Sequence, residues 1–230
     1  AKGVLLVDIS VIVATYNCER YIGRAIRSLT AQSFPKERYE IIVVDDGSTD
    51  HTKQVLESFG DWIKAVTIPE HRGLPYACNE GIKKALARFV VRVDADDYVH
   101  EDFLKTEYLF LSLNPEFDAV ACDYYLVDEK ENHIARANCD TEPIACGIMF
   151  KKDNLVAIGL YDEKFLMLED ADLRIRYLQK FKIYRIELPL YRYRRHKSNI
   201  TSDERSMQYY QNMLKEKHRK VSPRPSRKRR

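Results

Sequence analysis

Cysteine pairs, long apolar runs and a leader pattern are missing from this sequence of 230 residues. Its five cysteines are odd in number and none belongs to a Cys-x-x-Cys motif, which argues against a disulfide framework and a structural zinc site. No apolar run approaches the roughly 20 residues of a membrane-spanning helix, and the first residues lack a signal-peptide pattern. These two absences predict a cytoplasmic protein, and a content of 45% hydrophobic and 32% charged residues is typical of a globular one.

Acidic residues outnumber basic ones over most of the chain, although the net charge is +3. Residues 215–230 hold nine Lys or Arg and one Glu, a net charge of +8, which leaves 29 basic and 34 acidic residues in 1–214. The basic, proline-containing end predicts a disordered tail that suits peripheral contact with an anionic membrane. A solvated end without a partner explains it equally well, and we expect no specific nucleic-acid binding.

Short apolar runs alternate with helical patterns in the first half of the chain. β-branched residues dominate four runs, which predicts buried strands at Asp8–Thr15, Glu40–Asp45, Ile63–Ile68 and Phe89–Val93. Asn17 is expected to cap the first helix, and Pro75 begins a later helix that runs to about Arg88. This alternation predicts a mostly parallel sheet flanked by helices, with ligands bound beyond the carboxyl ends of the strands.

The second half has a different pattern. A helix is predicted from about Glu101 to Leu113, and another opens at Glu169-Asp170. Strands are predicted at Asp118–Val127 and His133–Ala137, which form a hairpin, and at Cys146–Phe150, Ile183–Ile186 and Leu190–Arg194. A capping box at Thr201 to Glu204 opens the last helix. No linker or repeat interrupts residues 1–214, so we expect one α/β domain there.

Three polar clusters follow the predicted strands, at Thr15-Tyr16-Asn17, at Asp45-Asp46 and at Asp94 to Asp97. Adjacent carboxylates repel one another unless a cation lies between them, and Mg²⁺ or Mn²⁺ prefers oxygen ligands. A solvated acidic turn is the more ordinary interpretation of one Asp-x-Asp motif. Because all three clusters should meet at one edge of the sheet, we favour a ligand site that contains a divalent metal.

Six segments, in this order, resemble the family 2 glycosyltransferases of the GT-A fold: Val11–Asn17, Glu40–Asp50, Gly73–Ile82, Val93–Asp97, Leu168–Asp170 and His196–Thr201. The resemblance implies a Rossmann-like sheet with a smaller acceptor-side hairpin and helix region. It implies inverting transfer of a hexosyl or N-acetylhexosaminyl group from a nucleotide diphosphate donor, with UDP favoured, as in polysaccharide biosynthesis. The acceptor would be a glycan or glycolipid hydroxyl. Residues 1–97 would bind the donor and 98–214 the acceptor.

The resemblance also implies roles for individual residues near the donor. Donor binding falls to Thr15, Tyr16, Glu19, Asp46, Arg72, Asp94 and Asp96. A carboxylate such as Asp46 can accept hydrogen bonds from a base or ribose, and Tyr16 offers an aromatic face to the base. Their structural alternatives are helix capping for the Asp45 to Asp50 segment and packing between sheet and helix for Tyr16.

The metal and the proton transfer are assigned in the same way. The resemblance implies an Mn²⁺ or Mg²⁺ site at Asp96, Asp97 and His196. Of the two aspartates, Asp96 is favoured as the ligand, and Asp97 is its rival. Asp170 matches the family's general base, which takes the proton of the acceptor hydroxyl. Acceptor binding would involve Glu169, Cys146 and Gly147, and the metal shell is the alternative place for Glu169. Acidic residues in the first turn of a helix also favour its dipole without any chemistry.

The chain departs from the family's pattern at one position, and two rival functions are also open. Many relatives carry an arginine where this chain has Cys78, and Arg72 is a candidate substitute for its diphosphate contact. A sugar nucleotidyltransferase could use a similar sheet and metal, but such enzymes usually need a glycine-rich phosphate loop, which Ala14–Arg20 lacks. The other rival is a non-catalytic module whose basic tail binds nucleic acid.

Overall fold

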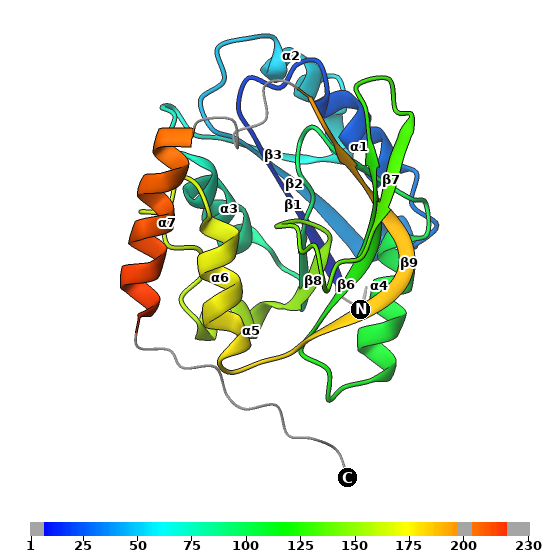
Figure 1. Cartoon of the computed structure of the whole chain (residues 1–230). Coiled ribbons are helices and arrows are strands. Elements are labelled where there is room, and N and C mark those ends of the chain that lie inside the picture. Colours follow the sequence, from blue (N-terminus) through cyan, green and yellow to red (C-terminus); the bar gives the residue numbers. More distant parts are fainter. Residues whose placement is uncertain (1–6, 197–203, 220–230) are drawn as a thin grey trace.

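In the computed structural model, which describes residues 7–196 and 204–219, one sheet runs through the middle of the protein (Figure 1). The described part of the chain contributes nine strands to it, in the order β3-β2-β1-β4-β8-β6-β9-β5, with β7 paired to β6. They are β1 Ile9–Thr15, β2 Tyr39–Asp45, β3 Lys64–Thr67, β4 Phe89–Arg92, β5 Tyr98–Val99, β6 Ala119–Val127, β7 His133–Ala137, β8 Ile148–Lys151 and β9 Ile183–Arg194.

The helices cover both faces of this sheet. They are α1 Ile22–Thr30, α2 Thr52–Glu57, α3 Leu74–Lys84, α4 Phe103–Leu113, α5 Lys152–Ala157, α6 Glu169–Leu178 and α7 Glu204–His218. Buried residues of α1 and α4 pack in one apolar cluster with Val11 and Val13 of β1. Buried residues of α3 and α6 pack in a second cluster with Ile12, which points to the opposite face. The expected α/β architecture is therefore confirmed.

The strands of the first half are parallel, as predicted. β1 pairs with β2 and β4, and β2 pairs with β3, all in parallel. In this register Thr15 lies opposite Asp45, so the ends of both strands meet at one edge. β8 then runs antiparallel to β4 and β6, while β6 and β9 pair in parallel and β6 and β7 form the predicted hairpin. The turn Asp128–Asn132 closes this hairpin.

Asn17 does not cap α1, contrary to the prediction. The helix begins at Ile22 after Tyr21, which makes no side-chain cap. Asn17 instead has a positive φ of 49°, and its side-chain oxygen accepts hydrogen bonds from the backbone N–H of Thr49 at 2.7 Å and of Asp50 at 3.3 Å. The asparagine therefore ties the loop after β1 to the loop after β2, a long-range contact that local sequence does not reveal.

Three elements also differ from the prediction. The two strands expected at 183–186 and 190–194 are one strand, β9, whose pairing with β6 shifts register on either side of Asp123. The short strand β5 was not expected, and α3 ends at Lys84, before Arg88. These register shifts accommodate Pro189 within a continuous strand.

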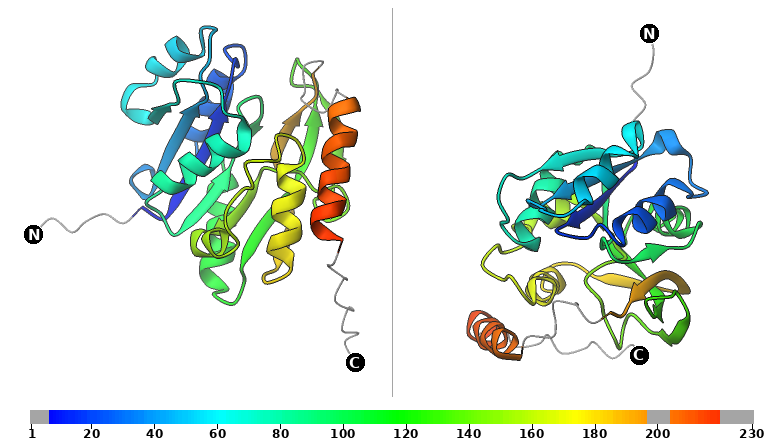
Figure 2. Two further views of the ribbon diagram at one scale, coloured as in Figure 1. Left: turned by 90° about the vertical axis from the view of Figure 1, so that its left-hand side faces the viewer. Right: turned by 90° about the horizontal axis from the view of Figure 1, so that it is seen from above.

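The basic segment does not begin as a disordered tail at residue 215. α7 extends to His218, and its last turn holds Asp172 of α6 through Lys217 at 2.7 Å and His218 at 2.8 Å. Figure 2 shows the two helices side by side. The prediction is therefore wrong for 215–218, whereas 220–230 and the expected cap at Thr201 lie outside the described residues. Among the described helices, none is long and apolar enough to cross a membrane.

Glu107 of α4 is fully buried, and neither of its carboxylate oxygens has a hydrogen-bond partner within the described part of the chain. Burial raises the pKa of Glu107 well above its ordinary value of 4.5, and the Cys122 thiol opposes this shift. Because the folded protein then holds this proton more tightly than the unfolded chain does, the contribution of Glu107 to the free energy of unfolding falls as the pH rises above 4.5.

The Glu107→Gln variant should lack this fall, because glutamine does not ionise. Its stability relative to the wild type should grow by up to ~1.4 kcal/mol per pH unit above the ordinary glutamate range, measured by urea unfolding between pH 5 and pH 8. The exposed Glu116 provides the control, and Glu116→Gln should follow the wild type at every pH. Parallel curves for Glu107→Gln and wild type would contradict a buried carboxyl group that is neutral in the folded protein.

Candidate active site

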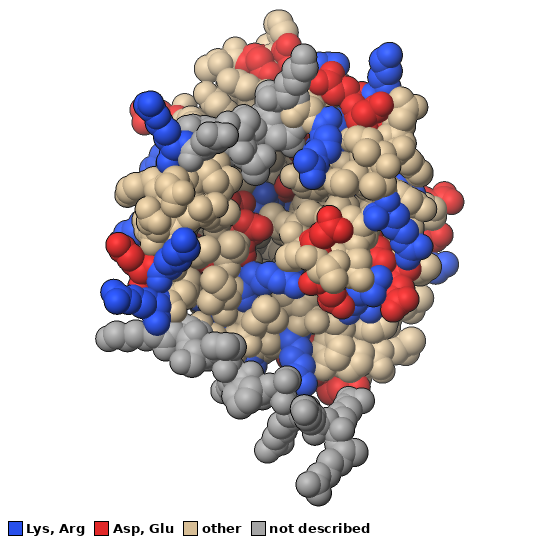
Figure 3. Space-filling view, in the orientation of Figure 1, with Lys and Arg blue, Asp and Glu red and all other residues tan. Residues whose placement is uncertain are grey.

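The ends of β1, β2 and β4 form one wall of the candidate site. The Asp46 N–H donates to the Thr15 carbonyl at 2.9 Å, so the segments that follow β1 and β2 stay in contact beyond the sheet. The Thr15 hydroxyl oxygen is buried and has no hydrogen-bond partner among the described residues. Buried polar atoms are normally paired, so this orphan hydroxyl fits a place that a ligand completes. The face seen in Figure 3 is hollowed near its centre, and charged side chains of both signs line the hollow.

Asp46 organises the loop that faces Tyr16. Its carboxylate accepts hydrogen bonds from the N–H groups of Arg72 at 2.9 Å and Gly73 at 2.8 Å, and it lies 2.8 Å from His71 Nδ1. The His71 ring stacks on Tyr16, with ring centroids 3.8 Å apart. Tyr16 is 43% exposed, so it presents a flat aromatic surface to solvent at the strand ends. His71 has no counterpart in the sequence prediction, because it becomes relevant only through this stack.

Two predicted donor-binding residues make protein contacts here. Glu19 accepts a hydrogen bond from the His51 N–H at 2.7 Å, just before α2, and its own N–H donates to Asp50 at 3.1 Å. The Arg72 guanidinium lies 4.4 Å from the centre of the Tyr76 ring. The structure thus gives Glu19 a role in holding the start of α2, and its contact with a donor stays a prediction, as does that of Arg72.

The acidic segment after β4 is held by groups from distant elements. Both oxygens of Asp94 accept hydrogen bonds from the Arg92 guanidinium, at 2.6 and 3.2 Å. Asp97 is buried and accepts hydrogen bonds from the Tyr191 hydroxyl at 2.8 Å and the Arg194 N–H at 2.7 Å. Burial raises the pKa of Asp97 well above its usual range, and the charges of Asp96 and Asp94 raise it further. A nearby cation would favour the charged carboxylates.

Asp96 differs from Asp97 in its exposure. Its side chain is 28% exposed, and one carboxylate oxygen lies 2.8 Å from His196 Nε2. The His196 ring stacks on Tyr21 with centroids 5.0 Å apart, which fixes its plane. Burial and the Asp94 charge raise the pKa of Asp96, and His196 opposes this shift. The structure therefore brings together Asp96 and His196, as the metal prediction requires.

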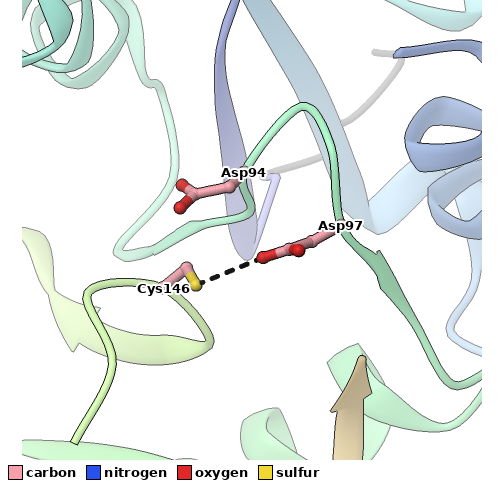
Figure 4. Close-up of side chains that lie close together, drawn as sticks. All are labelled: Asp94, Asp97 and Cys146. Carbon is pink, nitrogen blue, oxygen red and sulfur yellow. Dashed lines mark hydrogen bonds between the residues drawn. The ribbon is translucent and has the colours of Figure 1, made fainter. Parts of the chain in front are cut away.

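Asp94, Asp97 and Cys146 form a second arrangement of ligand-type atoms, all within 4.8 Å of one another (Figure 4). The Cys146 thiol points to Asp97, with Sγ 3.7 Å from a carboxylate oxygen. Burial raises the pKa of Cys146 well above its usual range, so the sulfur keeps its proton. A protonated thiol is a poor ligand for a hard cation, whereas the clustered carboxylates suit Mg²⁺ or Mn²⁺. The oxygen donors fit the implied metal, and Cys146 does not.

Gly147 lies beside Cys146 and supports the same tyrosine that holds Asp97. Its φ is +68°, and a Cβ atom there would stand 2.8 Å from the Tyr191 ring. Its N–H donates to the Arg92 carbonyl at 2.9 Å, which joins the start of β8 to β4. Glycine is therefore required by the close approach of Tyr191. Contact of Cys146 and Gly147 with an acceptor stays a prediction.

Glu169 and Asp170 open α6, after Leu168 with a positive φ of 62°, but their surroundings differ. Glu169 is buried and accepts a hydrogen bond from Arg92 at 3.0 Å. Burial raises the pKa of Glu169, and the Arg92 charge opposes this shift. Asp170 is half-buried, and no hydrogen bond or ion pair from the described residues engages its carboxylate. Arg92 therefore holds Glu169, and the general-base role of Asp170 stays a prediction.

The prediction missed Arg92, Tyr191 and Arg194. A charged residue inside the apolar run of β4 was the available signal for Arg92, because arginine is rarely buried without a partner. Arg194 enters the sequence prediction only as the end of a strand, yet its backbone N–H donates to Asp97 and its guanidinium donates to the Asp96 carbonyl at 2.8 Å. Tyr191 carried no signal, since its role depends on the pairing of β9 with β5 and β6.

Known proteins share both sequence and fold with this chain. It is 39% identical over 109 residues to the "Poly(ribitol-phosphate) beta-N-acetylglucosaminyltransferase TarS" of Staphylococcus aureus, a match that covers 46% of this chain and 19% of that protein. It is 33% identical over 174 residues to a "Dolichyl N-acetyl-alpha-D-glucosaminyl phosphate 3-beta-D-2,3-diacetamido-2,3-dideoxy-beta-D-glucuronosyltransferase" of Methanococcus voltae, covering 69% of this chain and 54% of the relative. The chain thus spans about a fifth to about half of these relatives.

Two solved structures have the same fold. Residues 1–349 of S. aureus TarS, in complex with UDP-GlcNAc, superpose with a TM-score of 0.80 at 22% identity, covering 94% of this chain and 68% of that chain. The mannosyltransferase PcManGT of Pyrobaculum calidifontis, in complex with GDP-Man and Mn²⁺, gives 0.74 at 20% identity, covering 94% and 65%. These likenesses establish the GT-A fold that the motifs implied.

The family profile described as "Glycosyl transferase family 2" matches residues 10–176. That range begins in β1 and ends in α6, so it includes the strand ends, the acidic segment and the two carboxylates of α6. Since the profile covers most of the chain and every wall of the site except the end of β9, this chain belongs to glycosyl transferase family 2.

Proposed function

We propose that this protein is an inverting glycosyltransferase that moves a sugar from a nucleotide diphosphate donor, with UDP favoured, to an acceptor hydroxyl. The observation that carries this proposal is the link from Asp94 through Arg92 to Glu169. It brings the acidic segment after β4 next to the start of α6, where the Asp170 carboxylate remains unengaged by the described residues. A donor held at the first element would therefore meet a proton acceptor at the second.

The chemistry follows from these positions. Asp170 accepts the proton of the acceptor hydroxyl while that oxygen forms a bond to the anomeric carbon of the sugar. The bond from the anomeric carbon to the diphosphate oxygen breaks, and its electron pair leaves with the diphosphate. Attack from the face opposite the leaving group inverts the configuration. Glu169 cannot take the same role, because Arg92 already binds its carboxylate.

The donor half supplies contacts for a nucleotide diphosphate. Tyr16 and His71 offer an aromatic surface for the base, and the orphan hydroxyl of Thr15 lies at the same strand ends. Asp96 and His196 would hold a divalent metal, which supplies positive charge to the diphosphate when bound. Complexes of structural neighbours with UDP-GlcNAc and with GDP-Man and Mn²⁺ support a donor and a metal of this class.

The sugar, the acceptor and the cellular location are also part of the proposed function. An N-acetylhexosaminyl or hexosyl donor and a glycan or glycolipid acceptor are supported by the names of the curated relatives. A cytoplasmic location belongs to the same proposal, and the peripheral contact with an anionic membrane rests on the basic C-terminal residues alone. Residues 1–97 would bind the donor and 98–214 would shape the acceptor site.

A nucleotide screen tests the proposal without knowledge of the acceptor. UDP, GDP, dTDP and CMP are each added with Mn²⁺ or with EDTA, and the melting temperature is recorded. UDP with Mn²⁺ should give the largest increase, because a ligand at 100 times its Kd adds ~2.7 kcal/mol of stability. A larger increase with GDP than with UDP would indicate a GDP-sugar donor in place of a UDP-sugar. No stabilisation by any nucleotide would contradict a nucleotide-sugar transferase.

A further inference from the structure

Arg92 is a buried charge at the end of β4, and only 7% of the residue is exposed. Its guanidinium makes three hydrogen bonds to two carboxylates. Nε and Nη2 donate to the two oxygens of Asp94 at 2.6 and 3.2 Å, and Nη1 donates to Glu169 at 3.0 Å. Burying a guanidinium costs several kcal/mol unless it is paired in good geometry, and this fork uses the planar shape that lysine lacks.

The two carboxylates belong to different parts of the site. Asp94 begins the acidic segment after β4, and Glu169 is the first residue of α6, 77 positions along the chain from Arg92. Asp170, the proposed base, follows Glu169 directly in the same helical turn. A fixed Glu169 therefore restricts where the Asp170 carboxylate can lie relative to Asp94.

Of the neighbouring residues, neither Cys78 nor Arg72 places a positive charge between the two carboxylates that Arg92 binds. Cys78 of α3 carries no charge, because burial raises the pKa of its thiol to about 12 despite the opposing effect of Arg92. The other arginine considered for this region, Arg72, lies over the Tyr76 ring instead. Arg92 thus places a cation next to the uncharged Cys78.

We propose that Arg92 is a positioning residue for sugar transfer, which holds Asp94 and Glu169 at a fixed separation so that Asp170 faces the anomeric carbon of the bound donor. This inference rests on the proposed function. It predicts that Arg92 acts on turnover through Glu169, and that its loss affects kcat far more than nucleotide affinity. Misplacement of a reacting group by about 1 Å can cost roughly 100-fold in rate.

The test measures UDP release from UDP-GlcNAc with Mn²⁺, since the acceptor is unknown and water can replace it. Arg92→Met and Glu169→Ala should each lower kcat by about 10- to 100-fold. The double variant should be no slower than the slower single variant, because both changes remove the same link. The control is Arg88→Met, which changes an exposed arginine just before the same strand and should leave kcat unchanged.

A purely structural role would give a different pattern. Calorimetry with UDP checks that each variant still binds nucleotide, and Arg92→Lys, which keeps the charge but has one donor group, should restore part of kcat. Multiplicative losses in the double variant, a loss confined to UDP affinity, or full activity in Arg92→Met would each overturn the inference. Wild-type protein that neither binds nucleotide nor releases UDP would overturn the proposed function as well.

Discussion

The Asp170→Asn variant is expected to lose about 10²- to 10⁴-fold in turnover while it keeps its affinity for nucleotide. Asparagine has nearly the same shape, but it cannot accept the proton of an attacking hydroxyl. The side chain is half-buried, and the described residues neither donate a hydrogen bond to it nor pair with it. The substitution therefore leaves packing and the neighbouring contacts of Glu169 unchanged. Turnover of donor and UDP binding by calorimetry measure the two quantities separately.

Asp153 gives a matched control for this substitution. It is an exposed aspartate in the first turn of α5, so Asp153→Asn makes the same chemical change at the start of another helix. Loss of a favourable helix-dipole interaction would cost both variants a similar 0.3–1 kcal/mol or so of stability, without an effect on turnover at position 153. If Asp170→Asn and Asp153→Asn turn over donor equally fast, the general base lies elsewhere.

The sheet was predictable because its strands are buried on both faces. In β1, β2 and β4, successive residues face opposite helix layers, and both layers are apolar. Apolar residues therefore occupy both faces of each strand, and the short run stands out in the sequence. Short or interrupted elements did not stand out. β5 has two residues, and its place in the sheet depends on pairing with β9, which sequence spacing does not encode.

The site was predictable where it follows a strand and obscure where it depends on tertiary contacts. Strand ends located Thr15, Asp46 and Asp94, because parallel strands deliver their following residues to one edge. The motif alone did not show whether Asp46 binds a ligand or holds a loop of the protein. In the structure its carboxylate accepts hydrogen bonds from two N–H groups of the 72–73 segment, so it holds that loop. Arg92 was overlooked because its partners lie on two elements.

The Asp96→Ala variant is expected to lose the metal dependence of nucleotide binding. In the wild type, UDP should bind at least tenfold more tightly with Mn²⁺ than with EDTA. In the variant this affinity ratio should approach one, because even a change outside the ligands of a metal site costs about 10- to 100-fold in metal affinity. Asp96 is the partly exposed aspartate of the segment, and it lies against His196. Titration of UDP by calorimetry, with and without Mn²⁺, measures both ratios.

Glu101→Ala controls for adventitious metal binding, because His100, Glu101 and Asp102 form another group of ligand-type side chains in the described structure. This exposed change should leave the Mn²⁺ response intact. An unaltered response in Asp96→Ala would contradict its assignment as a ligand.

The neighbouring aspartate should respond differently, which decides between the two candidates. Both Asp97 oxygens already accept hydrogen bonds, from the Tyr191 hydroxyl and the Arg194 N–H, inside the protein. Asp97→Asn leaves one of these donors facing an amide N–H₂ group, which should cost about 1–3 kcal/mol of stability. Its melting temperature should therefore fall while the Mn²⁺ dependence of the remaining folded protein persists. The reverse result, a stable Asp97→Asn variant without metal dependence, would move the ligand from Asp96 to Asp97.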